Sequence, residues 1–134
     1  MRMRDDRRRG MAAVEFALLL PVMALLILLM VEGGHAMHTY SSLVEASREG
    51  ARHVLMEGES ADVEALVAAV VADLDPEKLS TNVTTDPDAK TVTVEVSYVY
   101  ELFGSKSGQD DESEGMFGND EPLTFVAQTT MPLP

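Results

Sequence analysis

The sequence predicts an α+β fold: a long N-terminal transmembrane-plus-amphipathic helix, followed by a small domain in which one helix packs against a three-stranded antiparallel sheet. Three observations lead to this prediction. Residues 11–31 are apolar apart from Glu15. From there to Glu57, apolar residues recur every three or four positions, which is the period of a helix. Residues 91–100 instead alternate between apolar and polar side chains, which is the period of a strand.

The apolar run has the length of a membrane anchor. A helix over residues 11–31 rises about 30 Å, the thickness of the hydrocarbon core of a bilayer. Five Arg lie among the ten residues before it. The positive-inside rule therefore predicts a cytoplasmic leader over residues 1–10 and places residues 32–134 on the opposite side of the membrane. A buried core helix in a soluble protein is the alternative, but the remaining residues are too few to enclose it.

The totals exclude several classes of function. The chain has 134 residues, no cysteine and a net charge of −13, and its acids lie almost entirely after the first ten residues. An acidic body argues against nucleic acid as a partner, because phosphate binding needs a basic face. The absence of cysteine excludes a disulfide, a thiolate nucleophile and a cysteine-based metal site. No catalytic pattern is present, so the sequence does not predict an enzyme.

Residues 32–57 are expected to continue the helix as an amphipathic extension that ends at Gly58. Glu32, His35 and His38 follow one another at three-residue spacing, and two His with a carboxylate are a zinc donor set. A solvated polar face explains the same spacing, so neither a metal nor a cofactor is predicted. The side expected to be buried comprises Ala36, Met37, Tyr40, Leu43, Val44, Ser47, Ala51, Val54 and Leu55.

Residues 58–134 are predicted to form the small domain. A helix is expected over residues 60–74, with Ser60 as its N-cap and Pro76 after its end. Strands are expected over residues 78–85, 91–100 and 123–131, with a turn at residues 86–90 joining the first two. Residues 103–121 are acidic and glycine-rich, which predicts a solvated loop; a loose calcium site is the alternative there.

Two short patterns resemble a known family. Gly10 is followed by Met-Ala-Ala-Val and then Glu15-Phe16, which resembles the processing site of the Flp subgroup of type IV prepilins. Ala46-Ser47-Arg48-Glu49-Gly50-Ala51-Arg52 resembles the Ala-Arg-Glu-Gly-Ala-Arg-type motif of TadE-like proteins from tight-adherence pilus systems, with Ser where Ala is common. The resemblance covers about residues 7–56. The TadF and TadG relatives share the N-terminal pattern.

The resemblance implies a processing event. An aspartic membrane peptidase, the prepilin peptidase, would cut between Gly10 and Met11 on the cytoplasmic side. Glu15 would then face the new Met11 ammonium of a neighbouring subunit and set the register of assembly, because a paired charge costs far less than a lone one at low dielectric. From its position alone, Glu15 fits slightly better as a residue at the membrane interface, solvated and near the positive end of the helix dipole.

The resemblance also implies a role. The chain would be a minor pilin or pseudopilin of Flp-type pili, anchored in the inner membrane with a periplasmic domain, and could be incorporated in the pilus. Its partners would be the peptidase, other pilins or pseudopilins, and the pilus assembly machinery. The residues that carry the helix motif are Arg48, Glu49, Gly50, Ala51 and Arg52.

Two other interpretations stay open. One is an uncleaved single-pass anchor whose outer domain binds an unrelated partner. The other is a small secreted binder or enzyme that signal cleavage near Ala36 releases, although the apolar run is longer than the usual 7–15 residues of a signal peptide. The N-terminus of the mature chain separates the three.

Overall fold

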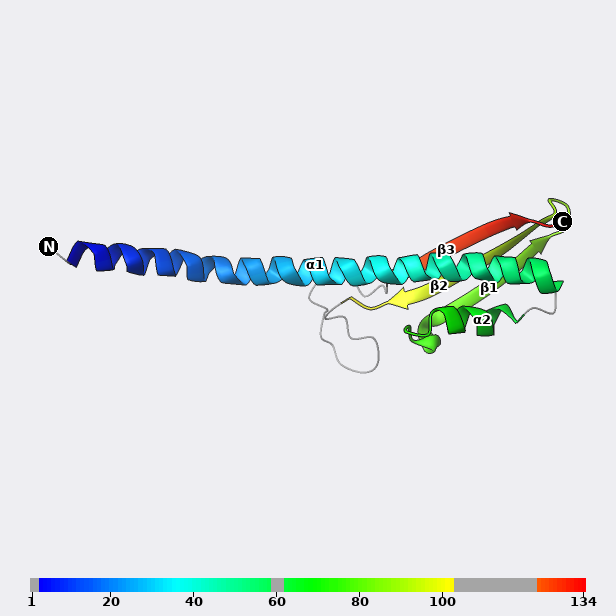
Figure 1. The fold of residues 1–134 in the computed structure, drawn as a ribbon, viewed down its shortest axis with the longest axis horizontal. Coiled ribbons are helices and arrows are strands. Elements are labelled where there is room, and N and C mark those ends of the chain that lie inside the picture. The colour runs from blue at the N-terminus through cyan, green and yellow to red at the C-terminus, as the bar shows by residue number, and fades with distance from the viewer. Residues whose placement is uncertain (1–2, 59–61, 103–122) are drawn as a thin grey trace, which may run out of the picture. The chain divides into compact units, whose positions relative to one another are not determined.

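A computed structural model describes residues 3–58, 62–102 and 123–134, with side chains from Gly10 onward (Figure 1). The elements follow the predicted order and confirm the α+β class. They are the helices α1 (Met3–Glu57) and α2 (Val63–Val70), the 3₁₀ turn η2 (Pro76–Lys78), and the strands β1 (Leu79–Asp86), β2 (Thr91–Tyr100) and β3 (Leu123–Pro132).

The helix α1 is continuous through Pro21, Gly33 and Gly34. It ends at Glu57, as the periodicity predicts, and Gly58 follows with φ of +71°. A left-handed residue directly after a helix favours glycine, because any β-carbon would be strained there. Gly58 therefore terminates α1 by its backbone conformation.

The chain divides into two compact units, Met1–His35 and Ala36–Pro134. The first holds the apolar run. Among the described residues, α1 is the one helix long and apolar enough to cross a membrane, and none of its most apolar stretch is buried in the chain. This finding is consistent with a membrane anchor. The boundaries expected after residues 10, 31 and 57 stay predictions.

The second unit is built on an antiparallel sheet of order β1-β2-β3. Val94 in the central strand lies opposite Val83 of β1 and Thr129 of β3. The face of β2 that carries Val94 is buried, and the C-terminal part of α1 and the helix α2 cover it (Figure 1). The buried apolar cluster comprises Leu43, Ala46, Ala51, Val54, Val63, Val67, Val71, Val92, Val94, Val96 and Ala127.

The hairpin between β1 and β2 closes as the sequence predicts. The Asp86 carboxylate accepts hydrogen bonds from the backbone N–H groups of Asp88 (2.9 Å) and Ala89 (3.0 Å). Lys90 completes the turn with φ of +53°. An aspartate that binds the backbone two residues on is a common turn device, so the Asp-Pro-Asp segment fixes the register of the strands.

The helix α2 is shorter than the predicted range of residues 60–74. Its N-cap is Asp62, whose carboxylate accepts from the Ala65 N–H at 3.1 Å; Ser60 lies outside the described residues. At the other end, Val71 leaves helical geometry and the Leu74 N–H turns back to the Val71 carbonyl at 2.9 Å. The prediction of a helix up to Leu74 is therefore wrong, and the chain uses this tight turn to reach Pro76.

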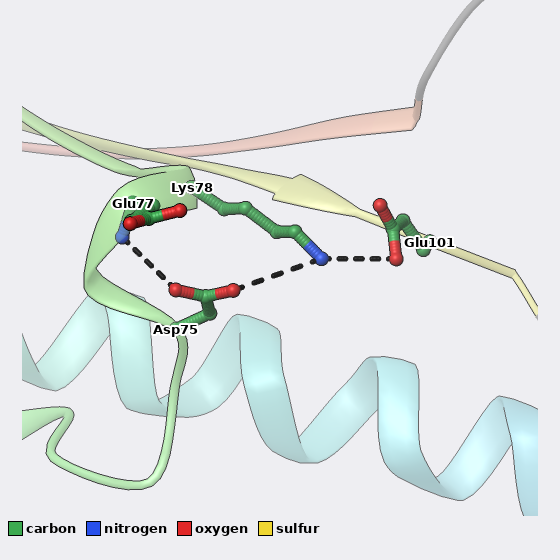
Figure 2. Close-up of polar contacts among 4 residues, drawn as sticks. All are labelled: Asp75, Glu77, Lys78 and Glu101. Atoms are coloured by element: carbon green, nitrogen blue, oxygen red, sulfur yellow. Dashed lines mark hydrogen bonds and ion pairs between the residues drawn. The ribbon is translucent and has the colours of Figure 1, made fainter. Parts of the chain in front are cut away.

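A small ion-pair network ties η2 to the end of β2 (Figure 2). The Lys78 ammonium lies 2.9 Å from the Glu101 carboxylate and 3.9 Å from that of Asp75. The hydrogen bond to Glu101 raises the pKa of Lys78 above its ordinary value. Asp75 also accepts from the Glu77 N–H at 3.0 Å, so one carboxylate both caps the turn and faces the lysine.

Candidate assembly surfaces on the long helix

The four residues of the expected processing site lie together on α1. Met11 and Phe16 expose 64% and 65% of their surface, and Glu15 is exposed as well. A β-carbon added to Gly10 would meet nothing within 4 Å. Met11 and Glu15 are four residues apart and so share one side of the helix. Nothing in the described part of the chain covers this segment.

The helix motif divides between the two sides of α1. Gly50 and Ala51 are buried, whereas Arg48, Glu49 and Arg52 are exposed. The motif therefore does two different things. Its small residues belong to the core of the second unit, and its charged residues face away from that core.

Gly50 lies at the point where α1, α2 and β2 meet. A β-carbon built on it would stand 3.0 Å from Cγ1 of Val63, 3.2 Å from Cγ1 of Val94 and 3.5 Å from Cγ2 of Val67. Side-chain carbons rarely approach below about 3.5 Å, where their attraction is greatest. Glycine at this position lets the helix backbone lie directly against the valines of two other elements.

Ser47, the residue that departs from the resembled motif, is almost fully buried. Its hydroxyl donates to the Val44 carbonyl at 2.9 Å and lies 2.7 Å from the Thr129 hydroxyl. Because the serine proton is used on Val44, the Thr129 hydroxyl is the donor of the second bond. Ser47 thus joins α1 to β3 through a satisfied polar contact.

The charged side of the motif makes no ion pair within the described residues. Glu45 and Arg48, and likewise Glu49 and Arg52, have the spacing of helical ion pairs, but neither pair forms. His38 of α1, in contrast, lies 3.5 Å from the carboxylate of Asp73, which follows α2 in the chain.

No group of three possible metal ligands gathers among the described side chains of residues 10–58, 62–102 and 123–134. His38 pairs with Asp73 and does not converge with Glu32 and His35. The possible calcium segment at residues 103–121 lies outside the described ranges.

Sequence reasoning missed Thr39, Ala46 and Gly50 as members of the buried side. It also placed Met37 and Tyr40 there, although they expose 74% and 47% of their surface. The missed signal was the set of small residues at positions 46, 47, 50 and 51, which recurs with the helix period and marks where a backbone can approach another element closely.

Fold and surfaces together define a small protein with one exposed apolar helix, a candidate membrane anchor, that continues into an α+β unit. A family model described as TadE-like protein matches residues 10–52, less than half of the chain. Residues 10–52 are therefore similar to TadE-like proteins, as the resemblance predicted. Comparisons with curated proteins and with solved structures gave no match.

Proposed function

We propose that this chain is a minor pilin or pseudopilin that contributes to the assembly of Flp-type pili and is processed by the prepilin peptidase. The observation that carries the proposal is the TadE-like match from Gly10 to Arg52, which spans the exposed apolar run and the whole helix motif. In this proposal α1 is anchored in the inner membrane, its N-terminus is cytoplasmic, and Ala36–Pro134 is periplasmic. The chain's own role is assembly and not catalysis.

The proposed cut falls between Gly10 and Met11, inside α1, which begins at Met3. A peptidase needs an extended backbone at the bond that it cleaves, so the first turns of α1 must unwind before the cut. Glycine makes this easier, since it disfavours the helix by about 1 kcal/mol relative to alanine. The open space around Gly10 leaves its backbone accessible to two catalytic carboxylates.

Glu15 gains its role after the cut. It lies one helical turn from the Met11 amine that the cut would create, and it is exposed on an apolar helix. A lone carboxylate in a membrane is costly, and an ammonium from a neighbouring subunit would compensate it. Glu15 would thereby favour one register between neighbouring helices over others.

The decisive measurement is the intact mass and N-terminal sequence of the full chain isolated from membranes of its own host. We expect a chain that begins at Met11. A chain that begins at Met1 would leave an uncleaved anchor, and a soluble chain that begins near Met37 would indicate a secreted protein; either result overturns the proposed processing.

A matched pair of variants tests the cleavage site itself. Gly10→Phe should block processing, because the bulky ring cannot lie beside the peptidase carboxylates. Gly33→Phe is the control, since Gly33 also lies on α1 in open space and is far from the cut. Normal processing of Gly10→Phe would contradict the proposed site.

Glu15→Leu tests assembly separately from insertion. The helix should still insert, because the substitution makes it more apolar. Co-purification with partner pilins should fall, because the Met11 ammonium of a neighbour loses its counter-charge. Unchanged co-purification would refute the role of Glu15 in register, and membrane fractionation is the control for insertion.

A further inference from the structure

Four charged residues form a continuous stripe on the exposed side of α1: Glu45, Arg48, Glu49 and Arg52, called here the charged stripe. All four are exposed. None makes an ion pair within the described part of the chain, although each has an opposite charge three or four residues away. The stripe thus offers two acids and two bases that have no ion-pair partner in the described part of the chain.

Packing fixes the direction in which the stripe faces. The opposite side of the same helix segment holds Leu43, Ala46 and Ala51, each with no exposed surface. Ser47 is bonded to Thr129 of β3, and Gly50 lies against β2 and α2. The helix cannot rotate about its axis without breaking these contacts, so the charged stripe is presented outward as a rigid surface.

The charge balance of the chain limits which partner this stripe fits. The whole chain carries −13, so two copies repel one another unless an acidic group meets a basic one. Among the described lysines, Lys78 is already held by Glu101, whereas Lys90 is exposed in the turn between β1 and β2. Arg48 and Arg52, interleaved with Glu45 and Glu49, make the stripe a place where a copy of this chain can attract another.

We propose that the charged stripe is a contact surface for the charged stripe of a second copy of this chain. The inference rests on the proposed function for one point only: copies anchored in one membrane run parallel. Two parallel helices in register place like charges opposite one another. A shift of three residues, about 4.5 Å along the axis, places Glu45 opposite the partner's Arg48 and Glu49 opposite the partner's Arg52.

This contact has the properties of an assembly contact. Because the stripe of each copy faces the stripe of its partner, the contact uses the same surface on both copies and joins them as a pair with a fixed axial offset. Each exposed ion pair is weak and is screened by salt. The stripe therefore acts when membrane anchoring holds the copies at high local concentration, and it selects their axial offset.

The absence of native cysteine allows a clean crosslinking test with the full chain in lipid vesicles. Ser41→Cys lies beside the stripe on the exposed side of α1, and Ser80→Cys, on β1, is the control. With a short bis-maleimide crosslinker at low salt, we expect several-fold more dimer from Ser41→Cys than from Ser80→Cys. Raising the salt to about 0.5 M should remove most of that difference. Equal yields from both positions would overturn the proposal.

Charge reversal makes the test specific. Glu45→Arg/Glu49→Arg gives an all-basic stripe and Arg48→Glu/Arg52→Glu an all-acidic one, each in the Ser41→Cys background. Each alone should crosslink several-fold less than the parent, and an equal mixture should recover the parental yield as mixed dimers. A mixture that stays as low as either variant alone would overturn the proposal.

Two controls separate this test from other causes. Glu64→Arg/Asp88→Arg, at exposed positions outside α1, changes the net charge as much as the all-basic stripe does and should keep the parental yield. The proposed processing is read independently from the N-terminus. A chain that begins at Met11 with a failed mixing experiment refutes the stripe contact alone, and an uncleaved chain with restored mixing refutes the processing alone.

Discussion

At the scale of single residues, Gly50 and Ser47 explain why small side chains gather in the helix motif. Gly50 lets α1 lie against two other elements, and Ser47 reaches across to β3 with a hydroxyl pair 2.7 Å long. At both positions the backbone of α1 packs closely against another element. One added methyl group or one lost hydroxyl there therefore changes the stability of the fold. Arg48 and Arg52, in contrast, make no contribution to this packing.

Substitution of Gly50 tests the close approach. Gly50→Ala gains about 1 kcal/mol of helix propensity, but its β-carbon would stand 3.0 Å from Val63 and 3.2 Å from Val94. Overpacking costs about 1–3 kcal/mol, so we expect a net loss of about 0–2 kcal/mol in the free energy of unfolding. Gly50→Leu should lose about 3 kcal/mol or more. Denaturant unfolding of the second unit in detergent measures both, and a stable Gly50→Leu would contradict the packing described.

The Ser47–Thr129 contact is best tested by a double-mutant cycle. Ser47→Ala restores the residue common in the resembled motif but removes two hydrogen bonds, and we expect a loss of about 1–3 kcal/mol. Thr129→Val keeps the shape of its side chain and removes the same contact from β3. The double variant should cost less than the two single variants together, by about 0.5–1 kcal/mol. Additive losses would show that the two hydroxyls act separately.

At the scale of elements, α1 has different surroundings along its length. Between Met11 and Val31 its apolar side chains are exposed all round, whereas from Thr39 onward one side is buried. The change explains why hydrophobicity alone misplaced Met37 and Tyr40. Burial in this helix follows where α2 and the sheet cover it, and Tyr40 reaches only an edge-to-face contact with Phe125, with ring centres 6.2 Å apart.

The link between η2 and β2 gives a pH dependence. The pKa of Lys78 is raised in the folded chain, so its pair with Glu101 contributes stability that is fully present below the ordinary lysine value of 10.5 and is lost as the pH rises through the raised pKa. Lys78→Met should therefore be less stable than the parent at about pH 8, and the difference should shrink at about pH 12. Thermal unfolding of both chains at the two pH values measures it; a constant difference would contradict the ion pair.

At the scale of the whole molecule, sequence periodicity was sufficient for the order of the elements and most strand bounds. The alternation in residues 91–100 predicted β2, and Gly58 predicted the end of α1, because these patterns are local consequences of burial and backbone geometry. The end of α2 was not predicted, since Val71 leaves the helix to form a turn toward Pro76. The helix propensity of residues 71–74 is a local property and carries no information about the turn that the fold needs there.

The candidate sites were predictable to different degrees. The segment from Gly10 to Glu15 and the motif at Arg48–Arg52 are both readable as sequence patterns, and both lie in the matched range. The division of the motif into buried and exposed members was not readable, because it depends on the position of Val63 and Val94 around Gly50. Val63 lies on the next helix and Val94 on the central strand, so their contact with Gly50 depends on how these elements pack.

Truncation of the chain tests whether the sheet needs its third strand, β3. A chain that ends at residue 122 lacks β3, which pairs with β2 along the whole of Thr91–Tyr100 and supplies the buried Ala127. We expect the β2 backbone amides to lose their protection against hydrogen exchange, because one row of their partners is gone. Mass spectrometry of the exchanged peptides measures this, and retained protection in β2 would show that β3 is dispensable.

The contact between the Ser47 and Thr129 hydroxyls also cannot form until late in the synthesis of the chain. The two residues are 82 positions apart, so a ribosome that adds about 5–20 residues per second needs about 4–16 s to make the second after the first. During that interval the inner side of α1 has been synthesised but the strand that completes its covering has not. A newly made chain thus passes through a state with an uncovered apolar helix, and its yield in the cell depends on what shields that helix until synthesis is finished.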